Sequence, residues 1–287
     1  MYDELDALTA DGVTLRIDRV TARGSRRGAV VCLHAMMTDG RYFGARRDGS
    51  FASTLADAGL DVYVADFRGH GRSVPPRAGR GDWTFDDLVE LDLPAIVGAA
   101  AAASGMSAGE LAILGHSLGG LVACAALGTG RIPPPRVLGL AATSVWLGET
   151  LRRRTIMRAY RGITKLLGRA PIRALRIGTA DEAAGYVDQL TGWAKHGRWT
   201  SLRGIDYRAA LDRIATPTFA FTGATDWMCQ PRDANQIAKR IPASEPLRVV
   251  GKTSGDLIDP DHFELFTRAE LTALHREIAE KLTPPAA

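Results

Sequence analysis

Short apolar runs alternate along the chain with longer segments of helical periodicity. Six runs stand out, the last weaker than the others: residues 29–33, 62–65, 111–114, 137–141, 218–221 and 247–250. Short continuous apolar runs are typical of strands that are buried on both faces. Residues 13–17 alternate instead between apolar and polar side chains, which predicts an antiparallel strand with one solvated face.

Helical patterns separate these runs: residues 51–58, 85–103, 118–127, 231–240 and 268–282. Strands that alternate with helices predict a mainly parallel α/β sheet with right-handed crossovers and helices on both faces. The alternation stops at residues 147–207, here called the inserted segment. There Ile156, Tyr160, Ile163 and Leu167 recur at helical spacing among basic residues, and no strand-like run occurs. We therefore expect a helical insertion that divides the chain into residues 1–146, 147–207 and 208–287.

Composition narrows the class of protein without naming an activity. Hydrophobic residues make up 46% and charged residues 24% of the 287 residues, as in folded globular proteins rather than disordered, collagenous or coiled-coil ones. The three cysteines form no CxxC pair, so we expect a reducing compartment and no disulfide framework. The acidic N-terminus does not resemble a secretory signal, and the longest small-apolar stretch, residues 95–106, is too short to span a bilayer. These features predict a cytoplasmic location.

A candidate nucleophile lies where a predicted strand meets a predicted helix. The sequence Gly-His-Ser-Leu-Gly-Gly at residues 115–120 follows the run at 111–114 and opens the helical segment at 118–127. A serine on such a sharp turn is strained and exposed, and its neighbouring glycines avoid clashes with a Cβ atom. The alternative is a glycine-rich turn in which Ser117 is incidental.

This turn resembles the nucleophile turn of the α/β-hydrolase family. Residues 33–36, Leu-His-Ala-Met, are similar to that family's oxyanion turn, with Ala35 where glycine is usual. Residues 66–73, Asp-Phe-Arg-Gly-His-Gly-Arg-Ser, are similar to its loop after the next strand. The amino-terminal half most resembles the serine aminopeptidase-like and monoacylglycerol lipase-like branch. The resemblance implies an α/β-hydrolase fold: a mainly parallel eight-stranded sheet flanked by helices, with a helical cap inserted before the last two strands.

The same resemblance implies a catalytic triad in the order Ser, Asp, His. Asp226 follows the run at 218–221, and His262 lies in the loop after the last run. With Ser117 they match the family's nucleophile, acid and base. Two alternatives stay open for the acid: Asp226 caps a loop or a helix, and Asp259 or Asp261 takes its place.

Further residues of the site are implied by the resemblance. The oxyanion donors are the backbone N–H groups of Leu118 and Met36. The substrate pocket is expected to include six side chains: His34, Ala35, His116, Trp146, Trp193 and Trp199. For each tryptophan the alternative is packing of the inserted segment onto the body. His275 lies in the polar final helix, where we expect it on the surface. No HExxH sequence and no Cys/His cluster with metal-ligand spacing occurs, so we expect no metal and no cofactor.

Charge is concentrated in the inserted segment. The net charge of +4 gives no argument for nucleic acid. Residues 147–208, however, hold thirteen Lys or Arg against five Asp or Glu, which leaves the rest of the chain net negative. This excess favours attraction of an anionic substrate or transient contact with an acidic membrane surface, and the alternative is an ordinary solvated helix face.

These observations lead to one hypothesis and three alternatives. The hypothesis is a serine hydrolase, esterase- or lipase-like, that cleaves a small carboxylic ester or thioester with an apolar acyl or aryl group through an acyl-enzyme. The alternatives are an acyltransferase with the same triad, a peptide or amide hydrolase, and a non-catalytic binding protein on the same fold. The sequence makes no prediction of the oligomeric state.

Overall fold

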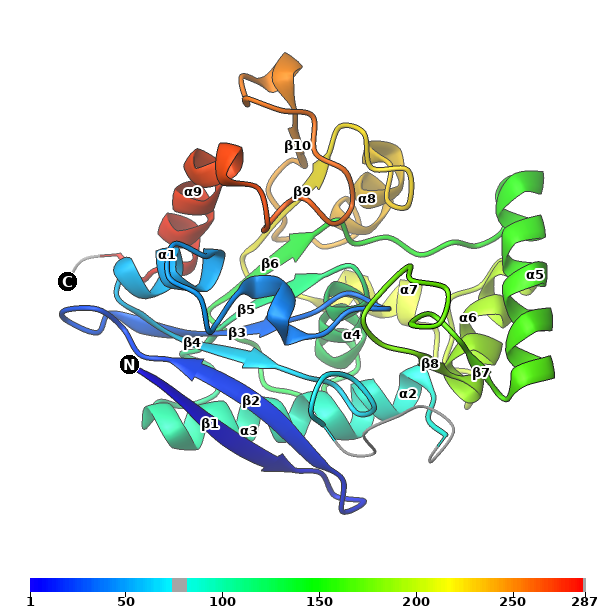
Figure 1. The fold of residues 1–287 in the computed structure, drawn as a ribbon, viewed down its shortest axis with the longest axis horizontal. Coiled ribbons are helices and arrows are strands. Elements are labelled where there is room, and N and C mark those ends of the chain that lie inside the picture. Colours follow the sequence, from blue (N-terminus) through cyan, green and yellow to red (C-terminus); the bar gives the residue numbers. More distant parts are fainter. Residues whose placement is uncertain (74–81, 286–287) are drawn as a thin grey trace.

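The computed structural model describes residues 1–73 and 82–285. One eight-stranded sheet runs in the order β1-β2-β4-β3-β5-β6-β9-β10 (Figure 1). β2 pairs antiparallel with β1 and β4, and every later pair is parallel. The expected mainly parallel, eight-stranded sheet is therefore confirmed. Its strands are β1 (Tyr2–Leu8), β2 (Thr14–Val20), β3 (Gly28–Leu33), β4 (Leu60–Ala65), β5 (Ala112–His116), β6 (Val137–Ala141), β9 (Thr218–Gly223) and β10 (Arg248–Val250).

Helices cover both faces of the sheet, and β3 shows why its sequence is continuously apolar. Val31 and Leu33 pack in one cluster with α3 and α4, whereas Val30 and Cys32 pack in a second cluster with α1 and α9. Figure 1 shows α1 and α9 together on one side and α3 on the other. The helices of this body are α1 (Phe51–Asp57), α2 (Phe85–Asp87), α3 (Leu93–Ser104), α4 (Leu118–Gly128), α8 (Pro231–Ala238) and α9 (Thr272–Leu282).

The helix predicted at residues 85–103 is one helical run with a π-helical turn, Leu88–Asp92, between α2 and α3. Pro94 has no N–H to donate to the carbonyl of Glu90, so the regular ladder of hydrogen bonds is interrupted there.

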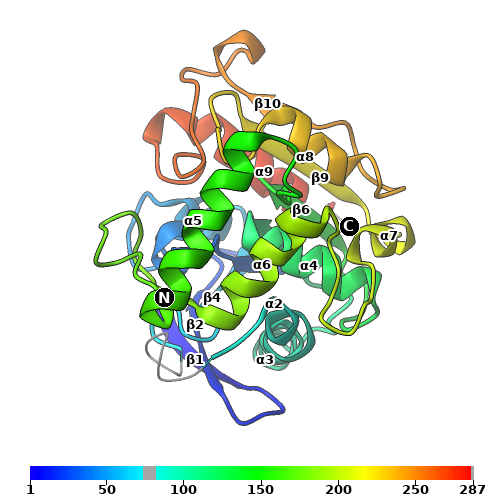
Figure 2. The same cartoon turned by 90° about the vertical axis from the view of Figure 1, so that its right-hand side faces the viewer.

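The inserted segment lies between β6 and β9, two strands that pair directly with each other. It contains α5 (Leu151–Leu167), β7 (Arg169–Ala170), β8 (Glu182–Ala183) and α6 (Ala184–His196), and α7 (Tyr207–Ala210) begins at its end. In Figure 1 the arrowheads of β5 and β6 point toward this segment, and in Figure 2 α5 and α6 lie side by side in front of the sheet. The expectation that it holds no strand is wrong, because β7 and β8 form an antiparallel pair. Two residues per strand are too few to leave an alternating pattern.

Strand β1 was not predicted from its own pattern. Most of its side chains are exposed or half-buried, and the acidic residues Asp3, Glu4 and Asp6 depart from the apolar alternation expected of a strand. It is an edge strand whose backbone pairs with β2 along its whole length. The pairing therefore depends on the neighbouring strand rather than on burial of its own side chains.

Candidate active site

Ser117 is the single residue between β5 and α4. Its backbone has φ 52° and ψ −108°, a region that residues with a side chain seldom adopt. Two backbone hydrogen bonds hold it there: its N–H donates to the carbonyl of Ala141 at 2.8 Å, and its carbonyl accepts from the N–H of Leu121 at 3.0 Å. The result is a sharp strand-to-helix turn with Ser117 partly exposed at its tip.

The glycines on either side of Ser117 are required by close packing. A Cβ at Gly115 would lie 2.4 Å from the backbone nitrogen of Gly120, and one at Gly119 would lie 2.4 Å from the carbonyl oxygen of Leu33. Both contacts are with backbone, which cannot rotate away as a side chain can. The glycines at these two positions are therefore needed for α4 to start this close to β3 and β5.

His262 and Asp226 meet although 36 residues separate them. Nδ1 of His262 lies 2.7 Å from Oδ2 of Asp226, and both side chains are buried. Because an ionised carboxylate only accepts hydrogen bonds, Nδ1 is the donor. The other carboxylate oxygen, Oδ1, accepts from the N–H groups of Met228 at 2.9 Å and Cys229 at 2.7 Å, which fixes the loop after β9.

The opposite ring nitrogen of His262, Nε2, is buried and has no hydrogen-bond partner among the residues that the structure describes. His262 and Ser117 both line one cavity. Asp259 and Asp261, the rival acids, bond backbone instead: Asp259 accepts from the N–H of Lys252 at 2.8 Å, and Asp261 accepts from that of Phe263 at 2.9 Å.

The two expected oxyanion donors line the same cavity as Ser117. Leu118 is the first residue of α4, and Met36 follows β3 in the turn at residues 34–39. Within the described part of the chain, the backbone N–H of neither residue donates to a protein acceptor. The turn is tied to α4, because the N–H of Gly119 donates to the carbonyl of His34 at 3.1 Å.

The cavity has a volume of about 410 Å³ and lies between the sheet and the inserted segment. From the inserted segment come Ile156, Tyr160 and Ile163, three of the four residues of the predicted apolar stripe. Leu167, the fourth, does not line it. The remaining side chains from this segment that line the cavity are Met157, Pro171, Ile172, Leu175, Ile177, Tyr186 and Leu190.

Of the three tryptophans expected in the pocket, one lines the cavity and two do not. Trp146 lines the cavity, and its Nε1–H donates to the carbonyl of Met228 at 2.7 Å. Trp193 and Trp199 are buried away from the cavity wall, where both pack edge-on against Phe85. Trp193 and Trp199 thus pack the inserted segment onto the body, which was the alternative to a place in the pocket. Trp227, which the sequence analysis did not single out, lines the cavity beside Asp226; its place next to the candidate acid was the available signal.

The family described as "Serine aminopeptidase, S33" matches residues 24–188, more than half of the chain. The chain belongs to this family. The resemblance to its branch of the α/β-hydrolases is thus confirmed. The matched residues include Met36, Ser117 and Leu118 and end before Asp226 and His262.

Among curated relatives, the likeness to lipases covers only part of each protein. Triacylglycerol lipase 2 of Arabidopsis thaliana is 31% identical over 135 residues, 42% of this chain and 32% of that protein. Lipase member N of Mus musculus is 30% identical over 140 residues, 44% of this chain and 34% of that protein. The aligned part spans about a third of the length of these relatives.

Solved structures of the same fold match nearly the whole chain. An esterase from Exiguobacterium antarcticum has a TM-score of 0.67 at 17% identity, over 96% of this chain and 98% of that one. A monoacylglycerol lipase from Paleococcus ferrophilus has a TM-score of 0.62 at 18% identity, over 93% and 98%. At these identities the likeness shows the fold, and the α/β-hydrolase fold implied by the sequence is confirmed.

The remaining residues expected in the pocket are buried and do not line the cavity: His34, Ala35 and His116. His34 and Ala35 hold the turn at residues 34–39, since Nδ1 of His34 donates to the carbonyl of Ala35 at 2.8 Å. Burial lowers the pKa of His34 to about 3, so the ring is neutral. The ring of His116 stacks on Tyr42 at 4.9 Å, and burial holds its pKa well below the usual value. His275, expected on the surface, is also buried and bonds the carbonyl of Leu265 at 2.9 Å.

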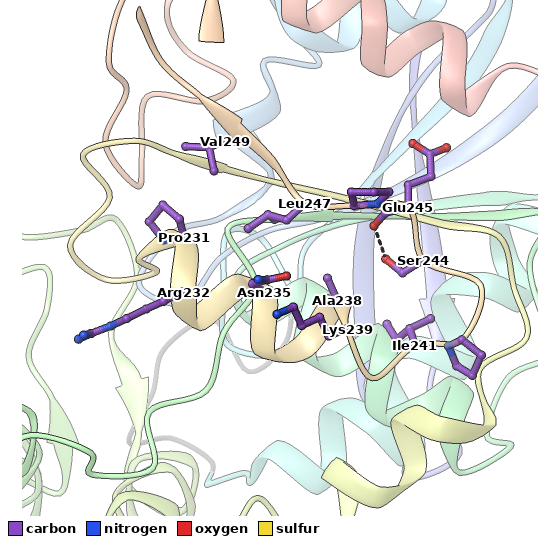
Figure 3. Close-up of a pocket in the computed structure, with 12 residues that line it drawn as sticks. Pro231, Arg232, Asn235, Ala238, Lys239, Ile241, Ser244, Glu245, Leu247 and Val249 are labelled. Carbon is purple, nitrogen blue, oxygen red and sulfur yellow. Dashed lines mark hydrogen bonds between the residues drawn. The ribbon is translucent and has the colours of Figure 1, made fainter. Parts of the chain in front are cut away.

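A second concave surface lies between α8 and residues 241–249 (Figure 3). It has neither His nor Cys in its lining, and the hydroxyl of Ser244 is engaged with the carbonyl of Glu245 at 3.0 Å. No serine–histidine or cysteine–histidine pair therefore lines this groove. Elsewhere in residues 1–73 and 82–285, no group of three or more potential metal ligands occurs. No helix in the same ranges is long and apolar enough to cross a membrane, and the cytoplasmic location stays a prediction.

Proposed function

We propose that this chain is a serine hydrolase that cleaves carboxylic esters or thioesters, with Ser117 as nucleophile, His262 as base and Asp226 as the acid that orients the base. One observation carries the proposal. Nδ1 of His262 is bound to Asp226, so the free lone pair is on Nε2, which has no described partner, and His262 lines the same cavity as Ser117. This is the tautomer that a general base for a serine hydroxyl needs.

The reaction follows from these roles. Nε2 of His262 takes the proton of the Ser117 hydroxyl as Oγ attacks the substrate carbonyl carbon, and the proton then passes to the leaving alkoxide or thiolate as its bond to that carbon breaks. Water attacks the acyl-enzyme in the same way, and the acid leaves with Ser117 restored. Asp226 stays ionised and stabilises the imidazolium. The backbone N–H groups of Met36 and Leu118 stabilise the oxyanion in both halves, the second with help from the start of α4.

The lining of the cavity favours an uncharged, apolar acyl or aryl group. Among the described residues that form its wall there is no Asp, Glu, Lys or Arg. An aminopeptidase substrate carries a free ammonium group, and burying that charge without a partner is unfavourable. The family's named activity therefore fits this cavity less well than ester cleavage does. We take the inserted segment, which supplies Tyr160 and Tyr186 to the wall, as the cap over the site.

The proposal is tested with p-nitrophenyl esters of increasing acyl length. Ser117→Ala and His262→Ala should each lose turnover, and Ser117→Ala should also lose labelling by a fluorophosphonate; the matched control is Ser254→Ala, on the exposed turn after β10. Ester turnover that survives Ser117→Ala overturns the proposal. Turnover that rises with an added alcohol identifies an acyltransferase, cleavage of p-nitroanilides alone identifies an amidase, and absence of labelling identifies a binding protein.

We also propose that the cap contacts an anionic lipid surface around the mouth of the cavity. Ile163, Leu175 and Ile177 line the cavity yet are about half exposed, and Leu166 beside them on α5 is 84% exposed. Exposed apolar residues grouped at a cavity mouth are typical of interaction sites.

The charge around this mouth fits an anionic surface. The exposed cations of the inserted segment that make no ion pair with the described residues include Arg158, Lys165, Arg173 and Arg176. Arg153 does not belong to this face, since it is buried between Glu149 and Asp233. Apolar side chains among free cations favour a lipid surface over a soluble anion such as a CoA thioester.

A further inference from the structure

We propose that Glu182, in the cap, is a positioning residue that holds the oxyanion turn in its active shape. This inference rests on the proposed function, because it assigns a role toward the N–H of Met36. Glu182 is the first residue of β8 and is fully buried. Its Oε1 accepts a hydrogen bond from the N–H of Met37 at 2.5 Å, across 145 residues of chain.

The cap forms hydrogen bonds with both the N–H and the carbonyl of Met37. While Glu182 accepts from its N–H, the carbonyl of Met37 accepts from the N–H groups of Thr179 at 2.8 Å and Ala180 at 3.2 Å. Packing is equally tight, since a Cβ at Gly178 would lie 2.3 Å from the carbonyl oxygen of Met37. Residues 178–182 thus form a clamp around one residue of the oxyanion turn.

Met37 needs such a clamp. Its φ is 63°, in the left-handed region that a residue with a side chain rarely occupies unless its surroundings hold it there. An unclamped methionine would favour the ordinary right-handed or extended regions. A change of φ or ψ at Met37 would move the peptide that joins it to Met36.

The peptide groups before and after Met36 are held by different parts of the chain. The plane before it is fixed by the carbonyl of Ala35, which accepts from Nδ1 of His34 at 2.8 Å and from the hydroxyl of Thr38 at 2.9 Å. Because a trans peptide is planar, these bonds set the direction of the Met36 N–H relative to the turn, and the position of the turn depends on what holds Met37. Among the described residues, the peptide after Met36 is held from the cap, through the bond between the Met37 N–H and Glu182. Preorganised donors are what an oxyanion site requires.

A buried histidine keeps the carboxylate in place. Nε2 of His70 lies 3.3 Å from Glu182, and its Nδ1 donates to the carbonyl of Arg68 at 2.9 Å. Burial opposes the charge on His70, but Glu182, together with the carbonyl of Arg68 and the charge of Asp66, raises its pKa to about 9. A buried carboxylate is unfavourable unless it is paired, so this pairing allows a charged acceptor at the oxyanion turn.

The clamp joins substrate binding to catalysis. The same segment lines the cavity on either side of Glu182, through Ile177 before it and Tyr186 after it. An acyl group seated against these residues stabilises the cap position in which Glu182 reaches Met37.

The experiment compares Glu182→Ala and Glu182→Gln with the wild type. The matched control is Asp188→Ala, which removes an acid of the same segment whose ion pair among the described residues is with Arg161 on the surface. We expect Glu182→Ala to lower kcat about 10- to 100-fold with KM within about twofold, since it leaves the donor present but poorly held. Glu182→Gln keeps a carbonyl acceptor and should recover most of kcat. The Ki of a trifluoromethyl ketone, which mimics the tetrahedral intermediate, should rise in proportion to the loss of kcat/KM.

The role proposed for Glu182 is overturned by either of two results with these variants. A folded Glu182→Ala whose kcat stays within twofold overturns the proposal, as does a rise in KM with kcat and Ki unchanged. If Glu182→Ala does not fold, the same comparison is made with Glu182→Gln against Glu182→Leu.

If the wild type cleaves no ester, the proposed function fails by itself. The clamp is then tested by the rate at which a fluorophosphonate labels Ser117 in each variant. Absence of wild-type labelling overturns both.

Discussion

Oδ2 of Asp226 lies 2.7 Å from Nδ1 of His262, and this bond sets which nitrogen of the ring carries the proton and which the free lone pair. We expect Asp226→Asn to lower kcat by about 10³-fold or more, because an amide can donate to Nδ1 and turn the ring to the wrong tautomer. Steady-state kinetics on the best p-nitrophenyl ester measures the effect.

Asp261→Asn is the control for that substitution. Asp261 lies next to His262 in the chain, yet its carboxylate accepts from the backbone N–H of Phe263. Its turnover should stay near that of the wild type. If Asp261→Asn fell as far as Asp226→Asn, the acid of the triad would have been assigned to the wrong residue.

The close approach of α4 to β3 predicts a large effect at Gly119. A Cβ there meets the carbonyl oxygen of Leu33, so we expect Gly119→Ala to lower the free energy of unfolding by about 2 kcal/mol or more and to reduce turnover. Gly98→Ala in α3 is the control: no atom lies within 4 Å of its Cβ, and alanine should add roughly 0.5–1 kcal/mol. Urea unfolding distinguishes the two; equal effects would contradict the packing argument.

The His70–Glu182 pair predicts a loss of stability at alkaline pH. The folded-state pKa of His70, about 9, lies above the unfolded value of about 6.5. The contribution of the pair to the free energy of unfolding is therefore complete below about pH 6.5 and is lost as pH rises through 9, by roughly 3 kcal/mol in all. Urea unfolding between pH 6 and 10 should show this slope in the wild type and in His196→Gln but not in His70→Gln. Parallel profiles for all three would refute it.

The cavity predicts how acyl chain length can be changed. Ile156 on α5 lines it, so we expect Ile156→Trp to move the optimum to shorter acyl chains and to raise KM for longer ones. Leu151→Trp, on the exposed part of the same helix, should leave the optimum where it is. An unchanged optimum in Ile156→Trp would show that the acyl group lies elsewhere.

Lipid contact through the cap predicts binding to anionic vesicles. We expect the chain to sediment with phosphatidylserine-containing vesicles more than with phosphatidylcholine alone, and less at high salt, because the cations at the cavity mouth are exposed. Leu166→Asp combined with Arg158→Glu should abolish this binding. Leu257→Asp, an equally exposed leucine outside the cap, should not. Sedimentation that is independent of lipid charge and of these substitutions would exclude the contact.

Local sequence patterns were sufficient to predict elements that are buried on both faces, because such elements are continuously apolar. The continuous run at β3 predicted a central strand, and the pattern Gly-x-Ser-x-Gly between strand and helix placed Ser117. β1 was missed because an edge strand can be polar on both faces. The pair β7–β8 was missed because it is held by its partner residues and not by a pattern of its own.

Which way a side chain faces could not be predicted within the cap. Arg153 falls in a run of arginines that suggests solvent, but it is buried against Asp233 of α8. Trp193 and Trp199 have the composition of a pocket wall, but they pack on Phe85. In each case the direction of the side chain is set by a partner distant in sequence, which no local pattern contains.

The sequence by itself determined the order of the buried strands and their helices, the strand-to-helix turn at Ser117 and the resemblance to the family, because these depend on short-range periodicity and on the steric needs of a few glycines. Only the tertiary structure decided that His262 meets Asp226, that the described residues of the cavity wall include no Asp, Glu, Lys or Arg, and that Glu182 reaches Met37. Those contacts join loops and a cap that are far apart along the chain. Their geometry follows from how the packed sheet brings strand ends together, a property of the whole fold.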